Sequence, residues 1–154
     1  MKILVVYYSR TGKTRAVAQM IAKKLNSDTE EIIDLKKRTG VIGYIFGGRD
    51  AMKKSLTKIK NPVRNPSKYD LVVVGTPIWA STMVPAVRTY LKNSKIKKAA
   101  LFYTAGGIGS EKVFEDMKET IGKVKIMGLL GLSGKDIRNG YEEKLNSFIK
   151  KIKK

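Results

Sequence analysis

The chain has 154 residues and a formal net charge of +19, and it contains neither cysteine nor histidine. This length fits one domain with one hydrophobic core, so we expect a single domain over residues 1–154. Without cysteine there is no disulfide, thiol nucleophile or thiolate metal site, and without histidine the commonest general base and metal ligand is missing. We therefore predict no catalytic or metal-binding side chains and expect a bound cofactor to carry any reactivity.

The distribution of charge and hydropathy bears on location and partners. No stretch is long enough for a membrane span and the first apolar run is too short for a signal peptide, so we expect a cytoplasmic protein. The positive charge predicts attraction to acidic partners. The lysines are spread over every predicted helix without interleaved aromatics, so no specific nucleic-acid partner is predicted. A solvated surface suited to an unusual ionic environment explains the charge equally well.

The first predicted strand, Ile3–Val6, leads through a polar turn into a helix that extends to about Lys24. Backbone N–H groups at a helix N-terminus favour an anion, and glycine in the turn lets the backbone approach it closely. Hydroxyl groups add hydrogen-bond donors. The sequence therefore predicts a phosphate site made of Ser9, Arg10, Thr11, Gly12, Lys13 and Thr14.

Two other interpretations of this turn stay open. The hydroxyl side chains could serve only to cap the helix. The turn also ends like a nucleoside-triphosphate loop, G-x-x-x-x-G-K-[ST], but the first glycine of that motif would fall at Tyr7.

The middle of the chain is predicted as a second strand, Glu30–Asp34, followed by a long crossover. Four glycines between Gly40 and Gly48 predict a loop, and the basic pattern around Asp50–Lys58 predicts a helix. The aromatic and apolar residues within the glycine-rich part either pack beneath the crossover or reach a ligand. These residues are Tyr44, Ile45 and Phe46.

The remaining elements alternate between strands and helices. Predicted strands are Leu71–Val74, Ala99–Tyr103 and Lys123–Leu132, and the helices between them begin near Pro85 and Ser110. The final helix is predicted to begin with a capping box that joins Asn139 and Glu142.

Five strands that alternate with helices predict an α/β domain with a parallel sheet. In the strand order 2-1-3-4-5, ligands bind at the carboxyl ends of the first and third strands. Hydroxyl-bearing turns follow the first, third and fourth predicted strands, so we expect them to meet at that edge. Trp79, in the second of these turns, either stacks on a planar ring or belongs to the core.

At these turns the chain resembles the flavodoxin family over essentially its whole length. Ser9–Thr14 looks like the phosphate loop T/S-x-T-G-x-T of that family. The resemblance implies a flavodoxin-like three-layer sandwich with a five-stranded parallel sheet of order 2-1-3-4-5. It also implies that two further loops contact the flavin ring. Their predicted residues are Thr76, Pro77, Ile78, Trp79 and Ala80 in one loop and Thr104, Ala105, Gly106 and Gly107 in the other.

The resemblance implies non-covalent FMN and a role in electron transfer between redox partners, which the charge predicts to be acidic proteins. An FMN-dependent NAD(P)H reductase of quinones or other small acceptors is the alternative, and a binding module with an anion site but no flavin is a third. Ala80 stands where the family pattern has a glycine. Since a Cβ atom penalises positive φ, we expect positive φ to be disfavoured at this position.

Overall fold

The computed structural model describes residues 1–36 and 40–154, except for the side chains of Val41 and Tyr44. The expectation for Tyr44 therefore lies outside the described part. The elements in chain order are β1 (Ile3–Tyr7), α1 (Lys13–Leu25), β2 (Asp28–Glu31), α2 (Gly40–Met52), the short 3-10 helix η1 (Pro66–Lys68), β3 (Leu71–Trp79), β4 (Thr82–Met83), α3 (Pro85–Asn93), β5 (Lys98–Thr104), α4 (Lys112–Ile121), β6 (Lys125–Leu132), α5 (Gly134–Asn139) and α6 (Glu142–Ile152).

Five parallel strands form the sheet in the order β2-β1-β3-β5-β6. Counted along the chain without β4, this is the predicted order 2-1-3-4-5, so the predicted fold class is confirmed. The addition is β4, which pairs antiparallel with the end of β3.

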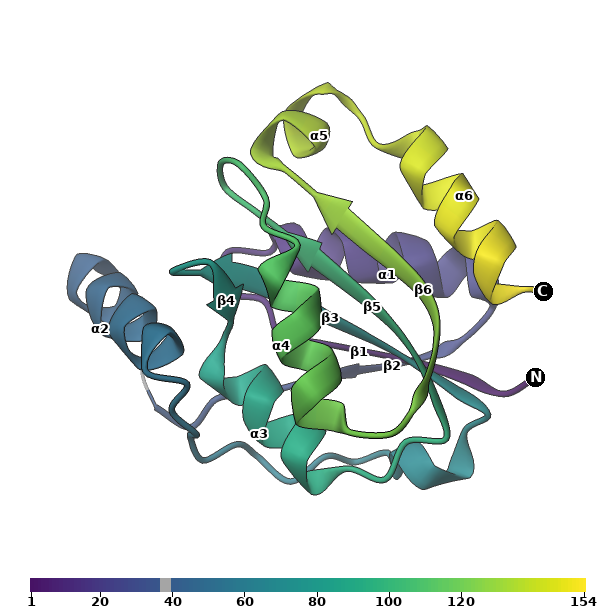
Figure 1. The fold of residues 1–154 in the computed structure, drawn as a ribbon, viewed down its shortest axis with the longest axis horizontal. Coiled ribbons are helices and arrows are strands. Elements are labelled where there is room, and N and C mark those ends of the chain that lie inside the picture. The colour runs from purple at the N-terminus through teal and green to yellow at the C-terminus, as the bar shows by residue number, and fades with distance from the viewer. Residues whose placement is uncertain (37–39) are drawn as a thin grey trace.

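Alternate residues of each strand face opposite sides of the sheet, and helices cover both sides. One core cluster joins Val5, Val73 and Phe102 to α1 and α6, and the other joins Leu4, Val72 and Leu101 to α3 and α4. In Figure 1, α3 and α4 lie in front of the sheet and α1 lies behind it. The result is the three-layer sandwich that the resemblance implied.

The second strand lies earlier in the chain than predicted. The structure pairs Asp28–Glu31 with β1, and the pairing ends at Tyr7 and Glu31. Beyond this point β1 passes into the polar turn, and the Ile33 carbonyl accepts a hydrogen bond from the Lys60 N–H over 2.9 Å instead of pairing with β1. Asp34 instead forms an isolated antiparallel bridge with Ile59.

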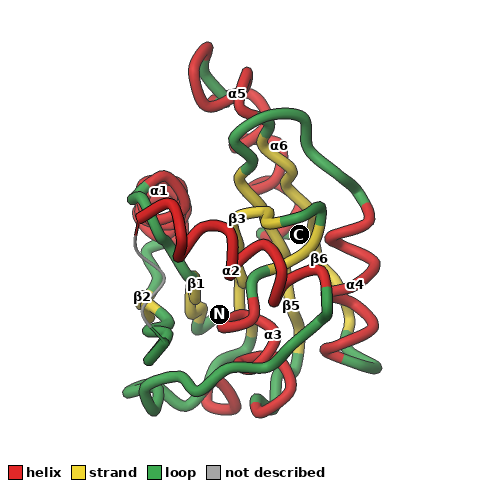
Figure 2. Tube along the Cα trace, turned by 90° about the vertical axis from the view of Figure 1, so that its left-hand side faces the viewer, coloured by secondary structure: helices red, strands yellow, loops and turns green. Residues whose placement is uncertain are grey.

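The predicted glycine-rich loop and the helix after it are wrong, because Gly40–Met52 is itself the helix α2. Gly43, Gly47 and Ala51 are buried at a spacing of four residues, which allows this helix to approach the protein closely. The chain turns at Lys54, whose φ is 53°. Figures 1 and 2 show α2 at the periphery, beside the carboxyl ends of the strands.

The predicted capping box at the final helix is also wrong. Asn139 ends α5, and α6 begins after Tyr141 without a side-chain cap. A capping box does exist one helix earlier, where Ser133 and Asp136 cap α5 reciprocally. Among residues 1–36 and 40–154, no helix is long and apolar enough to cross a membrane.

Candidate functional site

The three polar turns meet at a cavity of about 200 Å³ at the carboxyl edge of the sheet. Its lining residues, all of them predicted from the sequence, are Arg10, Thr11, Lys13, Thr14, Pro77, Ile78, Trp79, Thr104, Ala105 and Gly106. The other predicted residues, which do not line it, are Ser9, Gly12, Thr76, Ala80 and Gly107. The structure thus brings together the loops that the sequence placed at one edge, and their binding of a ligand stays a prediction.

The first turn presents the N-terminus of α1 to this cavity. Gly12 precedes the helix with a φ of 98°, a left-handed conformation that favours glycine. The Gly12 N–H donates to Ser9 Oγ over 3.0 Å, so Ser9 stabilises the turn. Within the described residues no side chain caps α1, and its first turn contains no acidic residue. The capping interpretation is therefore wrong, and the first N–H groups of α1 remain available to an anion.

Two threonine hydroxyls connect the first and third turns. Thr14 is 2% exposed and its Oγ1 lies 2.8 Å from Oγ1 of Thr104, which is 4% exposed. One hydroxyl of such a pair donates and the other accepts, so one proton stays free to bind an anion. The pair fixes the distance between the two turns.

We expect Thr104→Val to destabilise the protein by about 0.5–1.5 kcal/mol, because it removes this buried hydrogen bond while keeping the side-chain shape. Urea unfolding at pH 7 measures the effect. Thr104→Ser keeps the hydroxyl and is the matched control. A valine variant as stable as the serine variant would show that the bond contributes nothing to folding.

Trp79 forms one wall of the cavity and is also part of the core. Its side chain is 7% exposed and its ring meets Tyr8 edge-on, with centroids 5.7 Å apart and planes at 90°. Helix α2 covers it, since a Cβ built on Gly47 would lie 2.7 Å from the Trp79 ring. Glycine at position 47 therefore sets how closely α2 approaches the tryptophan.

We expect Gly47→Ala to displace Trp79 or α2, because a 2.7 Å approach is closer than packed atoms allow. Overpacking of this kind costs about 1–3 kcal/mol, against a gain of about 1 kcal/mol in helix propensity. Since Trp79 is the only tryptophan, a change in its emission maximum reports the displacement. Gly48→Ala, where a Cβ meets nothing within 4 Å, is the control and should leave the emission unchanged.

The second turn departs from the expected conformation. Ala80 and Ser81 have φ values of 50° and 62° and form the two-residue connection of the β3–β4 hairpin. The expectation of disfavoured positive φ at Ala80 is thus not met, since such hairpins require left-handed central residues. Thr76 is fully buried, and its hydroxyl donates to the Pro77 carbonyl over 2.8 Å and accepts from the Val84 N–H over 3.2 Å, so it stabilises this turn.

The third turn is held by residues that the sequence did not single out. Gly134 N–H donates to the Gly107 carbonyl over 2.8 Å, and a Cβ on Gly134 would lie 2.2 Å from the Gly106 oxygen. The Ala105 N–H donates to the Leu132 carbonyl over 2.8 Å. The only sequence signal for this contact was the Ser-Gly pair that follows the last strand.

Positively charged side chains lie in and next to the first turn. Lys13 is exposed, and Arg10 Nη2 donates to the Gly40 carbonyl over 3.0 Å, which connects the turn to α2. Arg15 pairs with Glu31 at 2.5 Å next to Tyr7. Burial and the charge of Glu31 raise the pKa of Tyr7, so its phenol stays protonated at neutral pH.

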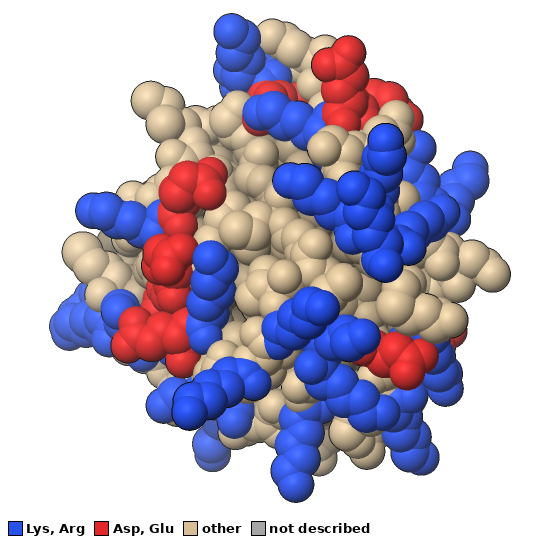
Figure 3. Space-filling model, turned by 45° about the vertical axis from the view of Figure 1, so that its right-hand side comes forward, with Lys and Arg blue, Asp and Glu red and all other residues tan. Residues whose placement is uncertain are grey.

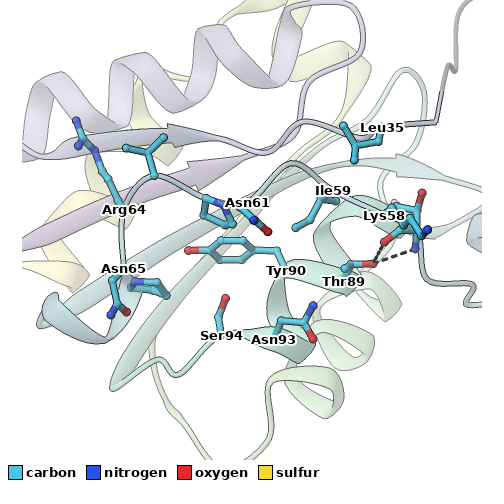
Figure 4. Close-up of a pocket in the computed structure, with 14 residues that line it drawn as sticks. Leu35, Lys58, Ile59, Asn61, Arg64, Asn65, Thr89, Tyr90, Asn93 and Ser94 are labelled. Atoms are coloured by element: carbon cyan, nitrogen blue, oxygen red, sulfur yellow. Dashed lines mark hydrogen bonds between the residues drawn. The ribbon is translucent and has the colours of Figure 1, made fainter.

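A larger cavity of about 630 Å³ lies elsewhere, between the segment 57–66 and α3. Figure 4 shows the ring of Tyr90 at its centre and the Thr89 side chain bonded to the main chain beside it. Tyr90 is 1% exposed, and burial raises the pKa of its hydroxyl. Its described lining includes the start of the short 3-10 helix η1 but no N-terminus of an α-helix and no turn directly after a strand of the sheet, so the smaller cavity is the better candidate site.

Comparison with known proteins agrees with this fold. A flavoprotein from Lactobacillus acidophilus, solved in complex with FMN, is 20% identical, with a TM-score of 0.71 over 90% of this chain and 97% of that chain. A putative flavoprotein from Bacteroides eggerthii is 24% identical, with a TM-score of 0.73 over 90% and 94% of the two chains. A flavodoxin from the domain Archaea is 16% identical, with a TM-score of 0.57 over 99% and 97%. No curated protein matches the chain. A profile of the flavodoxin domain matches residues 4–127, and the chain therefore belongs to the flavodoxin domain family.

Proposed function

We propose that this protein binds FMN non-covalently at the 200 Å³ cavity and carries electrons between redox partners. The observation that carries the proposal is the uncapped N-terminus of α1, which lies beside two cations and the Thr14–Thr104 pair. Such a donor set suits a phosphate group. The flavin supplies the redox chemistry, which the side chains of this protein lack.

The residues of the site divide by role. Residues of the turn 9–14 bind the phosphate through backbone N–H groups, hydroxyls and the charges of Arg10 and Lys13. Trp79 provides an apolar wall for the ring, and the turn 104–107 provides backbone groups on the other side. The cavity is smaller than the roughly 300–1,000 Å³ of enclosed ligand sites. A ligand larger than this cavity would extend into solvent, where a redox partner would have access to it.

Spectroscopy of the purified protein tests the cofactor. We expect flavin absorption bands and release of FMN on acid denaturation. A colourless protein that takes up no FMN would contradict the proposal and favour the third function, a binding module with an anion site but no flavin.

Addition of NAD(P)H under anaerobic conditions then distinguishes an electron carrier from an FMN-dependent reductase. No direct bleaching is expected of a carrier, and rapid bleaching would establish the FMN-dependent reductase instead.

The proposal includes acidic redox proteins as partners. The chain has 32 Lys and Arg residues against 13 Asp and Glu residues, and Figure 3 shows basic side chains distributed around one face, with fewer acidic ones among them. A positive field of this kind accelerates encounter with an acidic protein. Electron transfer to such a protein should slow steeply with salt, because screening acts within about 8–10 Å at physiological ionic strength. A rate independent of salt would contradict this part of the proposal.

A further inference from the structure

Helix α2 has an unusual distribution of side chains. Among its described side chains, the buried ones are small: Gly43, Gly47 and Ala51 are buried, and Gly47 lies against the Trp79 ring. Its outer side carries large apolar residues, with Ile42 69%, Ile45 61% and Phe46 46% exposed. A helix that packs on a core normally has the opposite arrangement. The apolar side of α2 is therefore turned toward the surroundings of the protein.

The exposed apolar residues form one stripe rather than isolated positions. Ile42, Ile45, Phe46 and Met52 are spaced by three, four and ten residues, which places them within about a third of the helix circumference. Met52 is 68% exposed, and Leu56, just beyond the helix, is 53% exposed. Figure 2 shows α2 in front of the body of the protein, with no other element over it. Contiguous exposed apolar surface of this kind marks an interaction site.

The charges around this stripe are mainly positive. One exposed basic residue, Arg49, lies within the stripe itself, three residues after Phe46 and four after Ile45. The other exposed basic residues lie before the helix at Lys36 and after it at Lys53, Lys54 and Lys58. The nearest acid of the helix, Asp50, is paired with Lys36 at 2.9 Å. A second copy of the chain would bring another charge of +19 to this surface, which disfavours self-association.

We propose that the outer side of α2 docks on an anionic lipid surface, with the helix lying parallel to the membrane. An apolar stripe that can enter the interface, with basic groups within it and at both of its ends to meet acidic headgroups, suits docking on an anionic lipid surface. The positive charge spread over the whole protein supplies attraction, and the stripe supplies orientation. No residue of the flavin cavity contributes to the stripe, so the inference stands independently of the proposed function.

The test measures co-sedimentation of the full-length protein with vesicles of phosphatidylglycerol and phosphatidylcholine, and with vesicles of phosphatidylcholine alone. Binding is expected to the anionic vesicles only. Ile45→Asp and Phe46→Asp should each lower the partition coefficient at least about tenfold. Val63→Asp makes the same change in charge at an apolar residue that is 82% exposed in the crossover, and it should have a much smaller effect.

A second measurement reports insertion directly. The chain has no cysteine, so Ile45→Cys gives a single site for an environment-sensitive fluorophore, and Val63→Cys gives the matched control. The emission at position 45 should shift to the blue with anionic vesicles while that at position 63 stays unchanged.

Equal effects at both positions, or no binding to vesicles, would overturn the proposal. So would α2 variants that bind vesicles normally but lose electron transfer to an acidic protein, since α2 would then be a protein-docking site. FMN titration of each variant distinguishes these outcomes from a failure of the cofactor site.

Discussion

FMN should bind to this protein at least about a hundredfold more tightly than riboflavin, which lacks the phosphate. The N-terminus of α1 is uncapped and lies beside Arg10 and Lys13 at the edge of the cavity. Each hydrogen bond to a charged group contributes about 1.5–3 kcal/mol, so two of them give about 3–6 kcal/mol, or roughly 10²- to 10⁴-fold in affinity. Titration of flavin fluorescence with apoprotein measures both constants.

The contribution of one hydroxyl can be separated within the same titration. Thr11→Ala should lower the affinity for FMN about tenfold and leave that for riboflavin unchanged, because only FMN has the phosphate. Ser147→Ala, on the exposed side of α6, is the control for removal of a hydroxyl far from the site. Equal affinities of the unmodified protein for FMN and riboflavin would show that the turn 9–14 does not bind the phosphate.

The parts of this fold that could be predicted from sequence are those in which local pattern and tertiary packing agree. The central strands are continuous apolar runs because both faces of the sheet are covered, and each ends in a turn with hydroxyls or glycine. Parallel pairing then forces these turns to one edge. That is why ten lining residues of the cavity could be placed together without coordinates.

Helix α2 could not be predicted because its pattern is the reverse of the usual one. Glycines are weak helix formers and normally indicate a loop, yet here Gly43 and Gly47 are buried, and Gly47 allows the helix to contact the Trp79 ring. The β3–β4 connection could not be predicted either, because its residues are unusual for the turn that they form. Two-residue hairpin turns with left-handed residues typically contain Asn-Gly, whereas this turn contains Ala80 and Ser81.

Details of the site depend on distances that the sequence does not contain. The hydrogen bond between Thr14 and Thr104 joins residues 90 positions apart, and only the order of the strands brings them together. The support of the third turn by Gly134 depends on α5, a helix too short to produce a clear periodic pattern.

Arg88→Met should destabilise the protein strongly while leaving the cavity untouched. Arg88 is 5% exposed and its guanidinium donates to both carboxylate oxygens of Asp116, at 3.0 and 2.5 Å. Thr82 in β4 donates to the same carboxylate at 2.5 Å, so this group ties the hairpin to α3 and α4. Among the described residues, removing Arg88 leaves the buried carboxylate with Lys54 at 3.7 Å as its ion-pair partner, and the expected cost is about 3–5 kcal/mol by urea unfolding at pH 7. The double variant Arg88→Met with Asp116→Leu should recover most of that loss, because apolar pairs often replace buried ion pairs without cost.

The same ion pair should shape the acid sensitivity of the protein. Burial acts to raise the pKa of Asp116, but hydrogen bonds from Arg88 and Thr82 and the charge of Lys54 outweigh it, so the pKa lies below its ordinary value. A carboxyl whose pKa is lower in the folded than in the unfolded state stabilises the fold above its unfolded value of about 3.9. That contribution is lost as the pH falls from about 4 through the folded-state pKa. Free energies of unfolding measured between pH 7 and pH 3 should therefore fall more steeply for the unmodified protein than for Asp116→Asn, which has no proton to take up. Parallel curves for the two proteins would show that other carboxylates, and not the Arg88–Asp116 pair, determine the response to acid.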